Sequence, residues 1–216
     1  MAVTAERFNQ GMSYDEFKAQ LSRARESYER SEQQLQMSEE DLAPFRGAAP
    51  FNVLVIVTET CPDVINNLPI LVRIGQETGN FQYRVFMRDD NKDLMAQFMN
   101  GPYESVPVFA FLDAEFNLRG VFIERPRSVT ELRDQKTREI HEQNPQFGSF
   151  GASAADLPDE ARDRLRAATQ SMREETGNFY RRETIRELQA LVTAMGQASA
   201  DSRPLWVGNL MMPVPA

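Results

Sequence analysis

The chemistry that this sequence can support centres on one thiol. Cys61 is the only cysteine among 216 residues, and it is followed by Pro62 and Asp63. Thr60 to Asp63 fits the Ser/Thr-x-x-Asp/Glu capping pattern, with proline in the first turn, where its missing N–H costs nothing. We therefore expect Thr60 to be the N-cap and Cys61 the first helical residue. A thiolate there faces unpaired backbone N–H groups, so we expect a Cys61 pKa below its usual value of about 8.5.

A structural role is the simpler alternative for this residue, because free cysteines are often buried as small apolar side chains. The position of Cys61 between a hydrophobic run and a helix favours the reactive thiol. One cysteine cannot build an internal disulfide framework, which fits a reducing compartment. His141 is the only histidine and lies in a charged segment, so the sequence predicts no zinc site of the usual N/S type.

Composition and charge narrow the class of protein. The formal net charge is −8 and the pI is about 4.9, which argues against nucleic acid as a partner. The N-terminal sequence has no apolar core of a signal peptide, and no apolar run approaches the roughly 20 residues that span a bilayer. We therefore expect a soluble cytoplasmic protein with no membrane partner. With 41% hydrophobic residues and 14 phenylalanines, the chain can bury a substantial core.

The elements that must position the thiol can be read from the hydrophobic pattern. The apolar run 51–57 predicts a strand buried on both faces, and 62–78 has helical spacing. A strand at 81–87, a helix at 91–99, strands at 106–113 and 118–125, and a helix at 128–142 follow. Two strands joined through a helix favour a parallel unit, and two joined by a short turn favour a hairpin. The prediction is an α/β fold of order β-α-β-α-β-β-α.

Helical segments flank this core. A capping box at Ser13 predicts a long helix to about Gln36, and a shorter one follows at 39–46. After a loop at 144–157, a helix opens near Glu160, breaks at Gly177 and is followed by another helix. The last residues, RPLWVGNLMMPVPA, are apolar and irregular, and we expect them to fold back onto the protein's own surface. A tail that docks onto a partner is the alternative. The predicted divisions are an N-terminal helical extension (1–50), the core (51–145) and a C-terminal extension with the tail (146–216).

Several short motifs make the chain resemble the thioredoxin fold. Pro69 lies eight residues after Cys61, the spacing of the proline that kinks this helix in thioredoxins, and Ser105-Val106-Pro107 matches their cis-proline segment. More narrowly, NLPIL, FMRDDNKDLMAQFM, SVPVFAFLD and IERP resemble bacterial thioredoxin-family proteins whose active site reads Trp-Cys-Gly-Asp-Cys. The resemblance covers nearly the whole chain. It implies that a cis Pro107 faces Cys61.

The sequence departs from that active site at positions that matter for catalysis. The family's motif falls on Thr60 to Val64, so the first cysteine is Cys61 and the second is replaced by Val64. Val55 occupies the position of the buried acid that deprotonates the second cysteine in thioredoxins. The motif is therefore reduced to a monothiol Cys-Pro-Asp-Val, and the base has been lost together with the thiol that it serves.

The first functional hypothesis is thiol-disulfide exchange through Cys61. A monothiol enzyme cannot clear its own mixed disulfide and needs an external thiol. We expect Cys61 to exchange with a small thiol, such as glutathione or bacillithiol, or with a mixed disulfide on a protein. Besides Cys61 and Pro107 as catalytic residues, the substrate-binding candidates are Thr60, Pro62, Asp63, Val64, Val106, Arg88 and Arg125. The Val106 N–H would align the substrate chain, and the two arginines would hold a carboxylate.

Two further hypotheses stay open. Loss of the second cysteine and of the buried acid is also expected in a redox-inactive protein that uses the fold only for binding, through its helical extensions. The weaker alternative is a thiol peroxidase, since Thr58-x-x-Cys61 fits the peroxiredoxin motif, but the proline that precedes it in that family falls on Leu54. The sequence predicts neither a cofactor nor a metal. It leaves the oligomeric state open, with a dimer possible.

Overall fold

A five-stranded sheet forms the centre of the computed structural model, which describes residues 3–199 and 201–211. The strand order is β2-β1-β3-β4-β5. Strands β1 and β2 are parallel, as are β4 and β5, whereas β3 is antiparallel to β1 and β4. The strands are β1 (Phe51–Val57), β2 (Phe81–Met87), β3 (Val108–Leu112), β4 (Leu118–Ile123) and β5 (Leu205–Gly208).

The predicted order of strands and helices is present. The α-helices are α1 (Ala5–Asn9), α2 (Tyr14–Gln20), α3 (Arg25–Gln34), α4 (Glu39–Arg46), α5 (Pro62–Thr78), α6 (Lys92–Met95), α7 (Arg127–Gln143), α8 (Asp159–Glu175) and α9 (Gly177–Gln197). Three short 3-10 helices are η1 (Arg88–Asp90), η2 (Pro145–Phe147) and η3 (Ala154–Asp156). Helix α6 is shorter than the predicted helix at 91–99, because η1 and a turn occupy its flanks.

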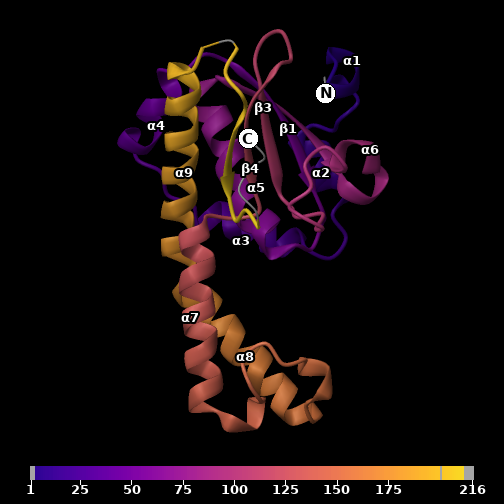
Figure 1. Cartoon of the computed structure of the whole chain (residues 1–216), viewed down its shortest axis with the longest axis vertical. Helices are drawn as coiled ribbons and strands as arrows, with labels where there is room; N and C mark the ends of the chain where they lie inside the picture. Colours follow the sequence, from indigo (N-terminus) through magenta and orange to yellow (C-terminus); the bar gives the residue numbers. More distant parts are fainter. Residues whose placement is uncertain (1–2, 200, 212–216) are drawn as a thin grey trace.

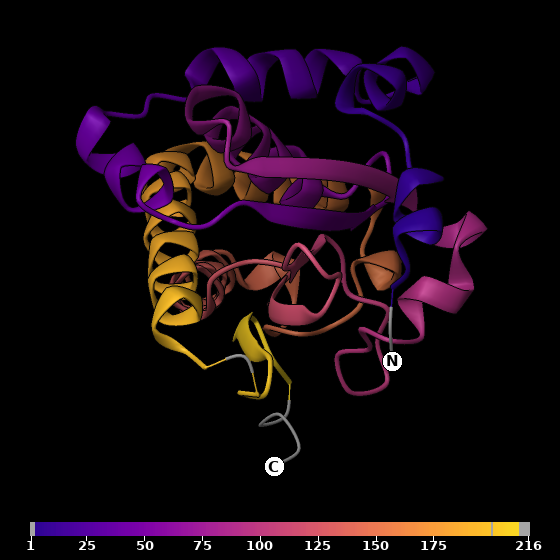
Figure 2. The same cartoon turned by 90° about the horizontal axis from the view of Figure 1, so that it is seen from above.

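Helices α5 and α9 cover the same face of the sheet. Helix α5 packs on β2, α9 packs on β4 and β5, and the two helices contact each other (Figures 1 and 2). Gly120 of β4 allows the close approach of α9, since a Cβ there would lie only 2.6 Å from the sulfur of Met195. Helices α7 and α8 extend away from the sheet as an arm, which Figure 1 shows below the core. Helix α9 therefore connects the arm to the sheet.

The single long helix predicted from Ser13 to about Gln36 is wrong. Helix α2 ends at Gln20 and α3 begins at Arg25. The connection is held by the Glu59 carboxylate, which accepts hydrogen bonds from consecutive backbone N–H groups at residues 22–24, with distances of 2.6 Å to the first and 3.2 Å to the last. A side chain two residues before Cys61 thus holds the turn that leads into α3.

The C-terminal segment is more regular than predicted. Residues 205–208 form β5, which extends the sheet beside β4 with Gly120 opposite Leu205. The expectation of an irregular segment is therefore wrong for these residues, although they do lie against the protein's own sheet. Residues 212–216 of the predicted tail lie outside the described residues. No helix within residues 3–199 and 201–211 is both long and apolar enough to cross a membrane.

Candidate functional site

The thiol lies between the end of the first strand of the core and the start of the helix that follows it. Strand β1 ends at Val57, a turn follows, and α5 begins at Pro62. Cys61 is the N-cap, with φ −67° and ψ 123°, so the prediction of Thr60 as the N-cap is wrong by one residue. Proline disfavours helical geometry in the residue before it, which keeps Cys61 extended. Thr60 is instead an exposed residue of the preceding turn.

The Cys61 side chain faces the segment that carries Pro107. Its Sγ donates a hydrogen bond to the backbone carbonyl of Val106 at 3.6 Å. The Val106–Pro107 peptide bond is cis. Both residues are buried, whereas Cys61 is half-buried. Among the described residues, no backbone carbonyl accepts a hydrogen bond from the Val106 N–H.

The electrostatic environment of Cys61 differs from the predicted one. Burial raises the pKa of the thiol above its usual value, and the negative charges of Asp63 and Glu124 raise it further. The backbone N–H groups of Val64 and Asp63 lower the pKa, as expected at a helix N-terminus, but they do not offset burial. The prediction of a lowered Cys61 pKa is therefore wrong for the protein without a bound substrate. The resting site favours the protonated thiol.

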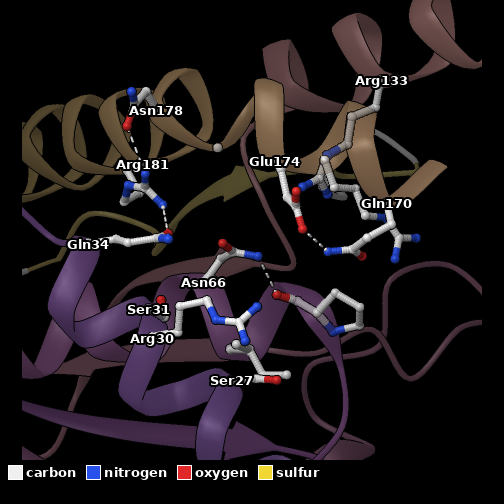
Figure 3. Close-up of a pocket in the computed structure, with 14 residues that line it drawn as sticks. Ser27, Arg30, Ser31, Gln34, Asn66, Arg133, Gln170, Glu174, Asn178 and Arg181 are labelled. Carbon is white, nitrogen blue, oxygen red and sulfur yellow. Dashed lines mark hydrogen bonds between the residues drawn. The ribbon is translucent and has the colours of Figure 1, made fainter. Parts of the chain in front are cut away.

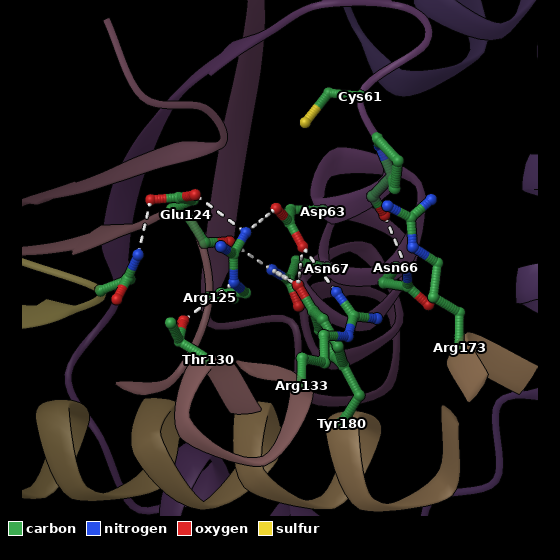
Figure 4. A network of polar contacts seen from close by, with 12 residues as sticks. Cys61, Asp63, Asn66, Asn67, Glu124, Arg125, Thr130, Arg133, Arg173 and Tyr180 are labelled. Carbon is green, nitrogen blue, oxygen red and sulfur yellow. Dashed lines mark hydrogen bonds and ion pairs between the residues drawn. The ribbon is translucent and has the colours of Figure 1, made fainter. Parts of the chain in front are cut away.

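Asp63 is the centre of a buried polar network beside the thiol (Figure 4). Its carboxylate forms ion pairs with Arg125 and, at 3.4 Å, with Arg133 of α7. Tyr180 of α9 donates a third hydrogen bond to it at 2.9 Å. The Asp63 side chain is 9% exposed, so this charge is tolerated only because its partners are present.

Asn67, one turn further along α5, extends the network. Its amide nitrogen donates to the Tyr180 hydroxyl at 2.9 Å and to the Glu124 carbonyl at 2.7 Å. Its amide oxygen accepts a hydrogen bond from Thr184 of α9 at 2.9 Å. The amide nitrogen and the amide oxygen of this fully buried side chain thus both have hydrogen-bond partners within the protein. The start of α5 is fixed by α9 through side chains rather than by apolar packing alone.

Glu124 connects this network to the proline segment. It has φ of 67°, an uncommon conformation for a residue with a side chain. Its N–H donates to the Pro107 carbonyl at 2.8 Å, and its carboxylate pairs with Arg125 at 2.8 Å. The second carboxylate oxygen accepts from Asn209, just after β5, at 3.1 Å. The backbone opposite Cys61 is therefore held by a residue that β4, α5 and the C-terminal segment all contact.

The structure does not leave the two predicted carboxylate-binding arginines free. Arg125 is paired with Asp63 and Glu124, and Arg88 forms ion pairs with Asp89 at 3.0 Å and Glu104 at 3.6 Å. Both are thus structural ion-pair residues here. Pro62 is exposed beside the thiol. Val64 is fully buried, one helical turn after Cys61.

Sequence reasoning missed several residues of the site. Tyr28 of α3 is fully buried, and burial, followed by the negative charge of an ionised Cys61, raises the pKa of its hydroxyl. The Tyr28 hydroxyl has no hydrogen-bond partner among the described residues. Tyr180, Thr184 and Arg133 were missed because they lie more than 70 positions from Cys61, on helices whose packing the pattern of apolar residues does not reveal. Within residues 3–199 and 201–211, no group of three His, Cys, Asp or Glu side chains is placed to hold a metal ion.

Comparison with known proteins agrees with this geometry. Residues 11–138 match a family described as Thioredoxin, so the chain belongs to the thioredoxin family. The match covers the N-terminal helices from α2 onward, the thiol, the cis-proline segment and most of α7. Family membership supports a general role of the thiol-disulfide oxidoreductase type.

Two solved structures have the same fold. A protein of unknown function from Pseudomonas aeruginosa is 21% identical, with a TM-score of 0.62 over 90% of this chain and 99% of its own. An HIV epitope scaffold is 18% identical, with a TM-score of 0.59 over 89% of this chain and 99% of its own. A search of curated proteins found no match. The similarity to both structures extends into the helical extensions, and at these identities it shows the fold alone.

Proposed function

We propose that the protein is a monothiol thiol-disulfide exchange protein that acts through Cys61. The observation that carries this proposal is the pairing of a half-buried thiol at a helix N-terminus with the Val106 carbonyl of a cis-proline segment, at 3.6 Å. Cys61 has no second cysteine to assist it, because Val64 stands one turn later on the same helix face. A reducing cytoplasm, such as that of a bacterium, fits a protein of this kind.

The proposed reaction has two balanced steps. The Cys61 thiolate attacks one sulfur of a disulfide, a bond forms between the two sulfurs, and the original S–S bond breaks. The departing thiolate takes up a proton from water. A free small thiol, of the glutathione or bacillithiol class, then attacks the substrate sulfur of the mixed disulfide as a thiolate; a new disulfide forms between these two sulfurs, and Cys61 leaves as a thiolate. An external thiol is required because Val64 offers no internal one.

The residues around Cys61 have separate roles in this proposal. The Val106 N–H, which has no backbone acceptor among the described residues, is assigned to the backbone of a bound substrate, while the Val106 carbonyl holds the resting thiol. The N–H groups of Asp63 and Val64 stabilise the thiolate once it forms. A substrate that displaces the hydrogen bond to Val106 would ease ionisation, since Cys61 would no longer donate to that carbonyl.

The raised pKa of Cys61 favours a second candidate, a redox-inactive binding protein. A thiol that stays protonated near neutral pH is a poor nucleophile. In that case the helical extensions would bind a partner without exchange at Cys61.

Exchange with a glutathionylated peptide separates these two functions. The reduced protein should release the peptide thiol and acquire one glutathione at Cys61, seen as a mass increase of the intact protein. The Cys61→Ser variant is the control and should do neither. Insulin should be reduced poorly, because no internal thiol releases the product. Absence of the mixed disulfide with the wild-type protein, at an excess of the peptide, would leave the binding function as the explanation.

A further inference from the structure

A cavity lies against the N-terminus of α5, beside Pro62. It has a volume of about 560 Å³, within the range typical of small-molecule sites. Pro62 and Asn66 of α5 line one wall, and α3, α7, α8 and α9 provide the others. Figure 3 shows polar side chains from these helices pointing into the same space. The cavity thus begins at the residue that follows Cys61.

Positive charge is concentrated around this cavity. Four arginines line it, against a single glutamate, in a chain whose net charge is −8: they are Arg30, Arg133, Arg173 and Arg181, with Glu174. Within the described part of the chain, Arg30, Arg173 and Arg181 pair with no carboxylate. Arg181 is held by amide oxygens only, donating to Asn178 at 2.7 Å and to Gln34 at 3.4 Å. The Arg181 guanidinium is therefore positioned without being neutralised.

Arg133 joins the cavity to the thiol site. One of its terminal nitrogens reaches Asp63 at 3.4 Å, and its side chain stacks on the Tyr180 ring, with 4.7 Å between the guanidinium carbon and the ring centroid. Its Nε is buried and has no hydrogen-bond partner among the described residues. A buried donor of this kind is costly unless something accepts its hydrogen. Arg133 thus contacts both the cavity and the carboxylate beside Cys61.

We infer that this cavity binds the carboxylates of the small thiol that exchanges at Cys61, an inference that rests on the proposed function. Guanidinium groups suit carboxylates because they donate two parallel hydrogen bonds. Adjacent Cα atoms are about 3.8 Å apart, and a tripeptide-sized molecule spans about 10 Å. A thiol of that size that reacts at Cys61 can reach past Pro62 into the cavity. Because α3, α8 and α9 supply three of the four arginines, this makes the helical extensions part of the substrate site.

The first test measures binding without chemistry. S-methylglutathione keeps both carboxylates and cannot exchange, and its affinity is measured by calorimetry. The double variant Arg30→Gln/Arg173→Gln removes two exposed cations of the cavity. The matched control, Arg164→Gln/Arg182→Gln, removes two exposed arginines of α8 and α9 that do not line the cavity. We expect binding at least tenfold weaker in the first variant, and unchanged in the control.

The second test measures exchange with two disulfides. With a glutathionylated peptide, kcat/KM should fall in the Arg30→Gln/Arg173→Gln variant and not in the control. With hydroxyethyl disulfide, which carries no carboxylate, both variants should match the wild type. Equal binding of S-methylglutathione by both double variants, or its absence in the wild type, overturns the inference and leaves exchange at Cys61 intact. Arginine-dependent binding without exchange would instead overturn the proposed function and keep the cavity as a carboxylate site.

Discussion

Removal of the Tyr180 hydroxyl tests whether the buried network holds α9 to the start of α5. Tyr180→Phe keeps the ring, and with it the contact to Arg133. It deletes the bond donated to Asp63 at 2.9 Å and the bond accepted from Asn67 at 2.9 Å. A hydrogen bond to a charged group contributes about 1.5–3 kcal/mol and a neutral one about 0.5–1.5 kcal/mol. We expect the free energy of unfolding to fall by about 2–4 kcal/mol.

The matched control is Tyr28→Phe. Tyr28 is as fully buried as Tyr180, but its hydroxyl has no hydrogen-bond partner among the described residues. Loss of an unpaired buried hydroxyl should leave stability unchanged or raise it, because the desolvation penalty disappears. The two variants therefore delete the same atom from equally buried rings with opposite expected outcomes.

Urea and thermal unfolding monitored by circular dichroism measure the difference. For a chain of this size, 1 kcal/mol corresponds to a shift in Tm of about 2–4 °C, so Tyr180→Phe should lower Tm by about 4–16 °C. An unchanged m-value would show that the shift reflects stability. If the two variants lose the same stability, the network contributes nothing beyond ring burial and the reasoning is refuted.

Three further outcomes follow from the site. Burial raises the Cys61 pKa, so the protonated thiol stabilises the folded protein below the unfolded pKa of about 8.5. In unfolding experiments from pH 7 to 10, this gain in stability over Cys61→Ser should disappear as pH rises through the higher folded pKa; a difference that stays constant would contradict it. The hydrogen bond from the Arg23 N–H, followed by those from its neighbours, lowers the Glu59 pKa, so Glu59→Gln should be less stable than the wild type at pH 7. In matched urea titrations, this difference in stability should close as pH falls below about 4; a difference that does not depend on pH would refute the role of the charged carboxylate. Val64→Cys places a second thiol one turn from Cys61 and should form a reversible disulfide, measured by mass with and without reductant, and acquire slow insulin reductase activity; failure to form it would contradict the shared helix face.

The parts that the sequence predicted well are those encoded locally. The apolar run at 51–57, the helical spacing at 62–78 and the turn between the hairpin strands each depend on neighbouring residues, and all three elements are present. The break between α2 and α3 was not predictable in this way. It depends on a Glu59 carboxylate 35 to 37 positions away that binds backbone N–H groups. Strand β5 likewise forms only because β4 offers an edge for it.

The site follows the same division. The position of Cys61 at the strand-to-helix junction could be read from Pro62 and the preceding apolar run. Its ionisation could not, because burial by residues distant in sequence outweighs the local N–H groups. Asp63 was predicted only as part of the motif, since its partner Tyr180 lies 117 positions away. The position of Cys61 thus follows from its neighbours in the sequence, whereas its ionisation depends on contacts with distant residues.

The connection between α5 and α9 also fixes an order of events during synthesis. Thr184, the last residue that bonds to Asn67, is made 123 positions after Cys61. At roughly 5–20 residues per second, translation takes about 6–25 s to cover that interval. During this time the nascent chain carries its thiol without the helix that encloses Asp63 and Asn67. The folded site is therefore completed late, and the newly made Cys61 depends on the redox state of its surroundings before the protein itself can control its reactivity.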